Sequence, residues 1–142
     1  MKQAALGRLL RGTLRTGQVR VLMCDTTNMA ELCRMTHEPS NVCAAALGRG
    51  ISAAALLTAS ADDPDSTNLT MTIKGGGPAG ALVVVAHGRR LKAYIDHPQV
   101  ELPLKANGKL DVGGALGKDG QLTVMRSFGF GEPYVGRVAL VS

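Results

Sequence analysis

Apolar residues recur with helical spacing in the first half of the chain and with strand spacing in the second half. A helix is predicted to begin at Asn28, because Glu31 stands three residues later and the two residues form a capping pair. Pro39 is expected to end this helix. A second helix is predicted from residue 40 or 41 to about Ala59, where the acidic loop 62–65 stops it.

The second predicted helix is apolar on nearly every side. Such a helix is either buried in a core or spans a membrane. Arg49 stands near its middle, and the uncharged run 50–61 is far shorter than the roughly 20 residues that a membrane span needs. The sequence therefore predicts a buried central helix, whose alanines and whose glycines Gly48 and Gly50 let other elements approach closely.

Strand patterns follow residue 66. Leu69, Met71 and Ile73 alternate with polar residues, as in a strand with one buried face. The continuous apolar run 82–86 predicts a strand covered on both faces. The turn 87–90 is expected to join it to a strand over 91–96 as a hairpin.

Turn signals and short apolar runs predict the remaining strands. Residues 13–23 predict an N-terminal strand with a turn at Thr16-Gly17, and the last strands are expected over 122–126 and 134–141. Asn107-Gly108 and Asp119-Gly120 predict two hairpin turns. The expected fold is a single α+β domain, with antiparallel sheets packed around a buried central helix and a further short helix.

Composition makes the expected core aliphatic. Hydrophobic residues form 45% of the 142 residues, but aromatic residues form only 3%. Six methionines add adaptable apolar side chains, which suit either a core or a surface that binds varied partners. Met23 and Met71 are predicted to lie in the core.

Charge is concentrated at the N-terminus. Residues 1–23 carry five basic side chains and no acid, and the other 119 residues carry eleven charges of each sign. Such a basic arm is able to contact nucleic acid or acidic lipid. The three cysteines, at 24, 33 and 43, form an odd set without a secretory signal, which indicates reduced thiols and a cytoplasmic protein.

Candidate chemistry is sparse along the chain. Residues 75–80 match the G-x-G-x-x-G pattern, but a strand is expected next, where a dinucleotide site needs a helix. His87 and His97 stand beside turns, with no nucleophile or paired carboxylate at a suggestive spacing. The spacings within one cysteine and histidine set do not match structural zinc sites: Cys24, Cys33, His37 and Cys43. We therefore expect no enzyme activity, no metal and no cofactor in this chain.

Several segments in fixed order resemble the N-terminal domain of the redox-regulated chaperones called heat-shock protein 33, the 33 kDa chaperonin family. The resemblance runs over about residues 8–142 and is carried by segments 17–21, 44–49, 73–80, 94–98, 102–103, 110–117, 122–124, 132–136 and 140–142. The residues of these motifs taken as structural are Gly75, Gly77, Pro78, Gly80, Gly113, Gly114, Pro133, Tyr134 and Gly136.

The resemblance implies an ATP-independent holdase that binds unfolding client proteins under oxidative stress and forms a homodimer. Residues 1–142 would be the client-binding and dimerisation domain. The family's linker and its C-terminal zinc switch, C-x-C followed by C-x-x-C, would lie beyond Ser142, so zinc and redox control are not expected here. The alternative is a nucleic-acid-binding module that uses the basic N-terminal arm.

Overall fold

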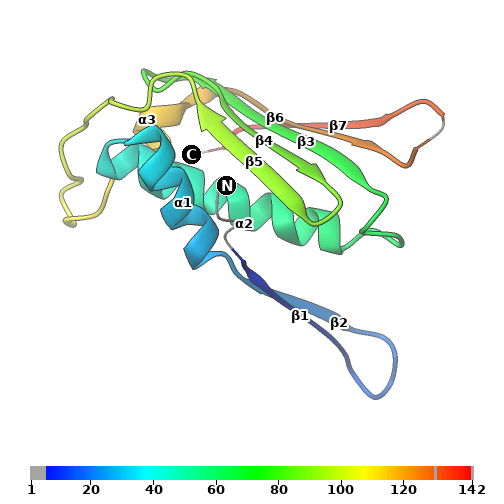
Figure 1. The fold of residues 1–142 in the computed structure, drawn as a ribbon. Coiled ribbons are helices and arrows are strands. Elements are labelled where there is room, and N and C mark those ends of the chain that lie inside the picture. Colours follow the sequence, from blue (N-terminus) through cyan, green and yellow to red (C-terminus); the bar gives the residue numbers. More distant parts are fainter. Residues whose placement is uncertain (1–5, 130, 142) are drawn as a thin grey trace.

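The computed structural model describes residues 6–129 and 131–141 of the chain. Its helices and antiparallel strands come in groups along the chain (Figure 1). In chain order they are β1 (Arg8–Thr13), β2 (Arg20–Asp25), α1 (Thr27–His37), α2 (Asn41–Ala59), β3 (Asn68–Gly76), β4 (Leu82–His87), β5 (Arg90–Ile95), α3 (Val112–Leu116), β6 (Gly117–Ser127) and β7 (Tyr134–Ala139).

A five-stranded antiparallel sheet forms the body of the molecule, in the order β5-β4-β3-β6-β7. Helix α2 lies across one face of this sheet, and α1 packs beside α2 (Figure 1). Period-two alternation places Leu69 and Met71 of β3, and Leu82 and Val84 of β4, on the face toward α2. The expected α+β fold, with antiparallel sheets and a central helix, is therefore confirmed.

Helix α2 is the centre of the core. Ser40 caps its N-terminus by accepting a hydrogen bond from the Cys43 N–H. Within the described part of the chain it is the one helix long and apolar enough to cross a membrane, and half of it is buried in the fold. Arg49 lies on its exposed side. The side chains that it buries are Val42, Cys43, Ala46, Leu47, Ile51, Ala54, Thr58 and Ala59.

Two expected local structures are wrong. Helix α1 begins at Thr27, one residue before the predicted start, and its N-cap residue Thr26 makes no side-chain capping bond. Glu31 instead forms an ion pair with Arg34, because residues three apart are neighbours on the surface of a helix. Asp119-Gly120 is not a turn but lies inside β6.

The segment between β5 and β6 also departs from expectation. Asn107-Gly108 does form a turn, in which the Gly108 N–H donates to Lys105, but no strands flank it. The five-residue helix α3 was not predicted, since two glycines in so short a segment give no helical pattern. Asp111 begins it by accepting a hydrogen bond from the Gly114 N–H.

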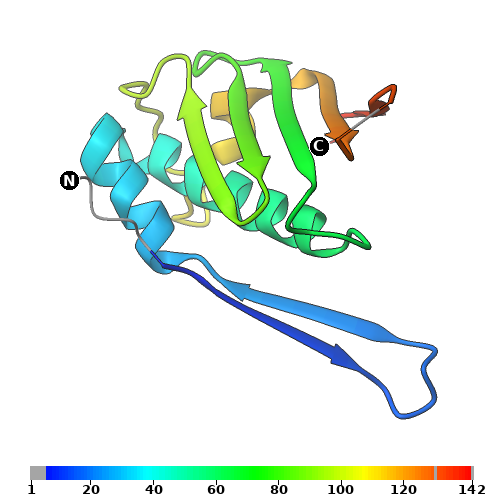
Figure 2. The ribbon, with the colours of Figure 1, turned by 45° about the vertical axis from the view of Figure 1, so that its right-hand side comes forward.

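Strands β1 and β2 form a separate two-stranded hairpin, which we call the arm. The arm projects away from the large sheet (Figure 2), and β2 contacts α2. Its register pairs Arg8 with Asp25 at the base and Thr13 with Arg20 near the tip. The turn predicted at Thr16-Gly17 is confirmed, since Gly17 takes a positive φ between the two strands.

Candidate functional site: the exposed face of the arm

The glycine motif joins two parts of the chain at one end of the sheet. The Gly77 N–H donates to Leu116, and the Ala79 N–H donates to Ala115, so residues 77–80 lie against α3. β4 begins at Leu82 directly after the motif. A dinucleotide site needs a helix directly after the glycines, so that the helix N-terminus holds the pyrophosphate. Here a strand follows, so the motif does not have the geometry of a dinucleotide site.

Close backbone contact explains most of these glycines. A Cβ atom on Gly75, Gly77 or Gly117 would lie closer than 3.0 Å to backbone atoms of the opposite segment. Gly80 takes a φ of +73°, and a Cβ on Gly114 would meet the Asp111 carboxylate. A Cβ on Gly113 would make only ordinary contacts, at 3.9 Å from side-chain atoms of Asp111 and Lys118. Pro133, Tyr134 and Gly136 lie apart from this cluster, just before and along β7.

The cysteines have separate surroundings in the fold. The buried Cys43 thiol donates to the carbonyl oxygens of His97 and Val100. Cys24 instead donates to Ser52, at the base of the arm. Among the residues that the structure describes, no three histidine, cysteine or acidic side chains come together as ligands would.

Two of the thiols have a raised pKa. Burial raises the pKa of Cys33, and burial together with the neighbouring Asp25 carboxylate raises the pKa of Cys24. A raised pKa lowers the thiolate fraction at neutral pH and slows alkylation.

We expect iodoacetamide at pH 7.5 to label Cys24 and Cys33 more slowly than a free cysteine in the unfolded chain, and Cys43 only after unfolding. Mass spectrometry of a labelling time course measures this. A native Cys24 or Cys33 that labels as fast as in urea would contradict the expected order.

The arm exposes a continuous apolar face. Cross-strand pairing places Leu10 opposite Met23 and Gly12 opposite Val21 on one face, and a Leu14 to Val19 hydrogen bond continues the register. We call these five side chains the arm stripe, and they are 47–66% exposed: Leu10, Leu14, Val19, Val21 and Met23. Met23 was predicted to lie in the core, and that prediction is wrong.

The opposite face of the arm is attached to α2. The Arg11 guanidinium donates to the Ala59 carbonyl at 2.7 Å, and Arg20 reaches the Ser60 carbonyl at 3.5 Å. Both carbonyls end α2, where the helix dipole favours a positive charge. At the base of the arm, the Thr26 and Ser52 hydroxyls share a hydrogen bond of 2.7 Å. These contacts turn the arm stripe away from the body.

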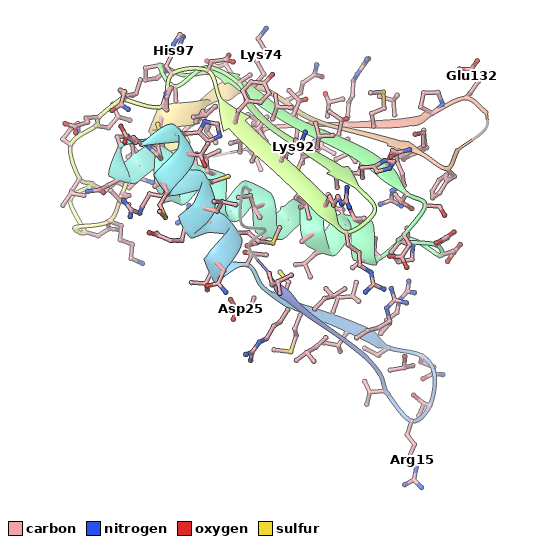
Figure 3. All side chains as sticks on the ribbon, viewed as in Figure 1. Arg15, Asp25, Lys74, Lys92, His97 and Glu132 are labelled. Carbon is pink, nitrogen blue, oxygen red and sulfur yellow. The ribbon has the colours of Figure 1, made fainter. Side chains whose placement is uncertain are left out.

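Charge is low along the arm stripe itself. Arg8 lies opposite Asp25 at the base, and Arg15 points away from the body at the tip (Figure 3). Hydrogen bonds from Thr27 are the main cause that lowers the pKa of Asp25, and Arg8 adds to it. The apolar stripe therefore lies between one charge pair and one arginine.

The outer face of the large sheet is more polar than the arm stripe. Val85 and Met125 are exposed there but are separated by Thr70 in the same cross-strand row. Lys74 and Lys92 belong to the same face, and Lys74 projects from the top of the sheet in Figure 3. Such alternation is typical of a solvated sheet face.

Two open grooves flank the base of the arm, with volumes of about 830 Å³ and 580 Å³. Cys24 and Asp25 line both grooves. Asp25 already accepts two hydrogen bonds from Thr27, and Glu31 is paired with Arg34. The charged groups of the grooves are therefore already paired, whereas the apolar side chains of the arm stripe are exposed to solvent. The arm stripe is thus the better candidate for a binding surface.

Comparison with known proteins gives a consistent result. The Hsp33 protein family matches residues 7–142. The chain is 45% identical over 136 residues to a 33 kDa chaperonin of Synechocystis sp., and 40% identical to one of Clostridium tetani. The alignments cover 95% of this chain but 45% and 46% of those relatives, so the chain spans a little under half of their length.

A solved structure shows the same architecture. The crystal structure of the 33 kDa chaperonin, the heat shock protein 33 homologue of Thermotoga maritima, superposes with a TM-score of 0.82 at 34% identity. The match covers 93% of this chain and 45% of that chain. Together with the family match over residues 7–142, it shows that this chain belongs to the Hsp33 family.

Proposed function

We propose that the chain is the client-binding domain of an ATP-independent holdase, a cytoplasmic stress-response chaperone that acts as a homodimer on unfolded or misfolded proteins. The name chaperonin, which its relatives carry, supports a chaperone role without enzyme activity. The redox switch and its zinc would belong to a separate domain, and the scattered positions of possible metal ligands among the described residues support that division.

The arm stripe carries this proposal. Unfolding proteins expose apolar segments, and a holdase needs an apolar surface that stays exposed to solvent in its own fold. Fully burying a leucine, valine or methionine side chain is worth about 1.5–3 kcal/mol. Five such side chains, each about half exposed, offer several kcal/mol to an apolar client segment. Leucine and methionine side chains also adapt to varied partners.

The nucleic-acid alternative finds less support in the arm. Two of its four arginines, Arg11 and Arg20, are bonded to the end of α2 and lie on the attached face. A nucleic-acid surface needs free cations in a row along the phosphates. We therefore propose that the arm binds clients rather than RNA.

Light scattering of a heat-aggregating client tests the proposal. A Leu10→Ser, Val21→Thr, Met23→Gln variant should lose about tenfold or more in affinity for the client, since 1.4 kcal/mol is tenfold. Met35→Gln is the matched control, because Met35 is 65% exposed on α1 and Met23 is 60% exposed on the arm stripe. The control should suppress aggregation like the unchanged chain.

Two outcomes would overturn the proposal. The first is equal suppression by the arm stripe variant and the Met35→Gln control. The second is salt-dependent RNA binding by a chain that suppresses no aggregation, which would favour the nucleic-acid alternative.

A further inference from the structure

The two faces of the arm are oriented against the hydrophobic effect. The arm stripe, which is apolar, points away from the body. The face toward the body instead carries Arg11, Thr13 and Arg20. Burial of apolar surface would favour the opposite orientation, because it would remove the stripe from water. Specific contacts are therefore needed to hold the arm as the structure shows it.

Strand β2 runs alongside the second half of α2, in the opposite direction. Cys24 contacts the Ser52 carbonyl, and Arg20, four residues away, contacts the Ser60 carbonyl. Four strand residues rise about 13 Å, and the helix rises about 12 Å between those two carbonyls. The strand and the helix therefore keep in step over this length.

Long side chains make the contacts where the arm diverges from α2. The two elements separate toward the tip of the arm (Figures 1 and 2). At the base of the arm, the short side chains of Cys24 and Thr26 reach α2. Farther along the arm, the contacts come from Arg11 and Arg20. Arginine combines the length and the positive charge that this place requires.

The end of α2 supplies acceptors for these arginines. The last four carbonyls of a helix have no partner within the helix, and the helix dipole makes this end negative. Arg126 of β6 donates to the Leu57 carbonyl at 3.1 Å, from the side of the large sheet. Arg11 and Arg20 bind the carbonyls of residues 59 and 60 from the side of the arm. The same helix end thus offers a matched contact that does not involve the arm.

We propose that Arg11 and Arg20 are positioning residues for client binding. They hold the arm stripe outward, and without them the arm turns its apolar face toward the body. A surface held ready in this way spares the client the cost of rearranging it. The inference rests on the holdase function proposed above and adds two residues that act through the orientation of the stripe. That orientation is measurable without any client.

Methionine oxidation reports the orientation of the arm. Met23 on the arm stripe is 60% exposed, Met35 on α1 is 65% exposed, and Met71 in the core is 1% exposed. Hydrogen peroxide should therefore oxidise Met23 and Met35 at similar rates in the unchanged chain and spare Met71. In the variant Arg11→Gln with Arg20→Gln, Met23 should oxidise about threefold more slowly relative to Met35, as when a third of the molecules keep the arm outward. Peptide mass spectrometry measures all three rates.

Client affinity should fall together with the Met23 rate. Light scattering of a heat-aggregating client should show about threefold weaker binding by the Arg11→Gln, Arg20→Gln variant, because the binding-competent fraction is smaller by that factor. Arg126→Gln removes a cation from the same helix end, and Arg15→Gln removes one from the tip of the arm, where Arg15 points away from the body (Figure 3). Both controls should keep the Met23 rate and the client affinity of the unchanged chain.

Three outcomes would overturn the inference. The first is a Met23 rate or a client affinity in the double variant equal to that of the unchanged chain. The second is the same slowing of Met23 in Arg126→Gln, which would assign the effect to the helix end rather than to the arm contacts. The third is oxidation of Met71 in the double variant, which would mean that the contacts hold the whole fold. If Met23 slows as expected but the unchanged chain suppresses no aggregation, the holdase proposal fails and the orientation of the arm stands.

Discussion

Gly117→Ala is expected to destabilise the chain by about 3–5 kcal/mol, a large share of the roughly 5–15 kcal/mol by which native domains are stable. Gly117 takes a φ of +87°, which side chains rarely adopt, and a Cβ there would meet the backbone of Gly75 and Gly77. Both partners are backbone atoms, so neither has a flexible end that moves aside. Urea denaturation followed by circular dichroism measures the loss.

Gly113→Ala is the matched control for this glycine prediction. Gly113 belongs to the same sequence motif, but its Cβ would come no closer than 3.9 Å to any atom, in helix α3. Alanine favours a helix over glycine by about 0.5–1 kcal/mol, so the unfolding midpoint should stay or rise. Equal losses at Gly113 and Gly117 would contradict the close-contact explanation of the motif.

Ala54→Leu is expected to destabilise the chain by about 1–3 kcal/mol, because Ala54 lies on the buried side of α2 and is fully buried. Gly50, one turn earlier on α2, already has no room for a Cβ beside Leu82. The sheet therefore lies too close to α2 for a larger side chain. Thermal and urea denaturation measure the change.

Ala53→Leu supplies the control on the same helix. Ala53 is exposed, so a leucine there meets no packed atoms and should change stability by less than about 0.5 kcal/mol. If both leucine variants unfold at the same urea concentration, α2 is not enclosed as described.

Periodicity predicted the parts of the fold that pack on one shared core. Helix α2 and strands β3, β4 and β5 lie close to their expected bounds, because each buries a regular face. The turn predicted at Asp119-Gly120 was wrong because glycine occurs both in turns and where two backbones come close together. Here it admits the Lys74 backbone beside β6 rather than making a turn, and only the paired strand reveals this.

The candidate site was harder to predict, because it too depends on which distant segments come into contact. Val19, Val21 and Met23 show the alternation of a strand with one buried face, and alternation alone does not reveal whether anything covers that face. Arg11 and Arg20 read as free positive charge in the sequence, whereas the structure places them at the end of α2. Both facts depend on contacts between distant segments.

The arm stripe and the hydrophobic core have no residue in common. In many proteins the residues that bind a partner also pack in the core, so a substitution that improves binding lowers folding stability. Here Leu10, Val21 or Met23 is replaceable without opening a cavity beneath it. On the holdase proposal, the range of bound client sequences is therefore free to diverge under directed evolution while the scaffold keeps its own stability.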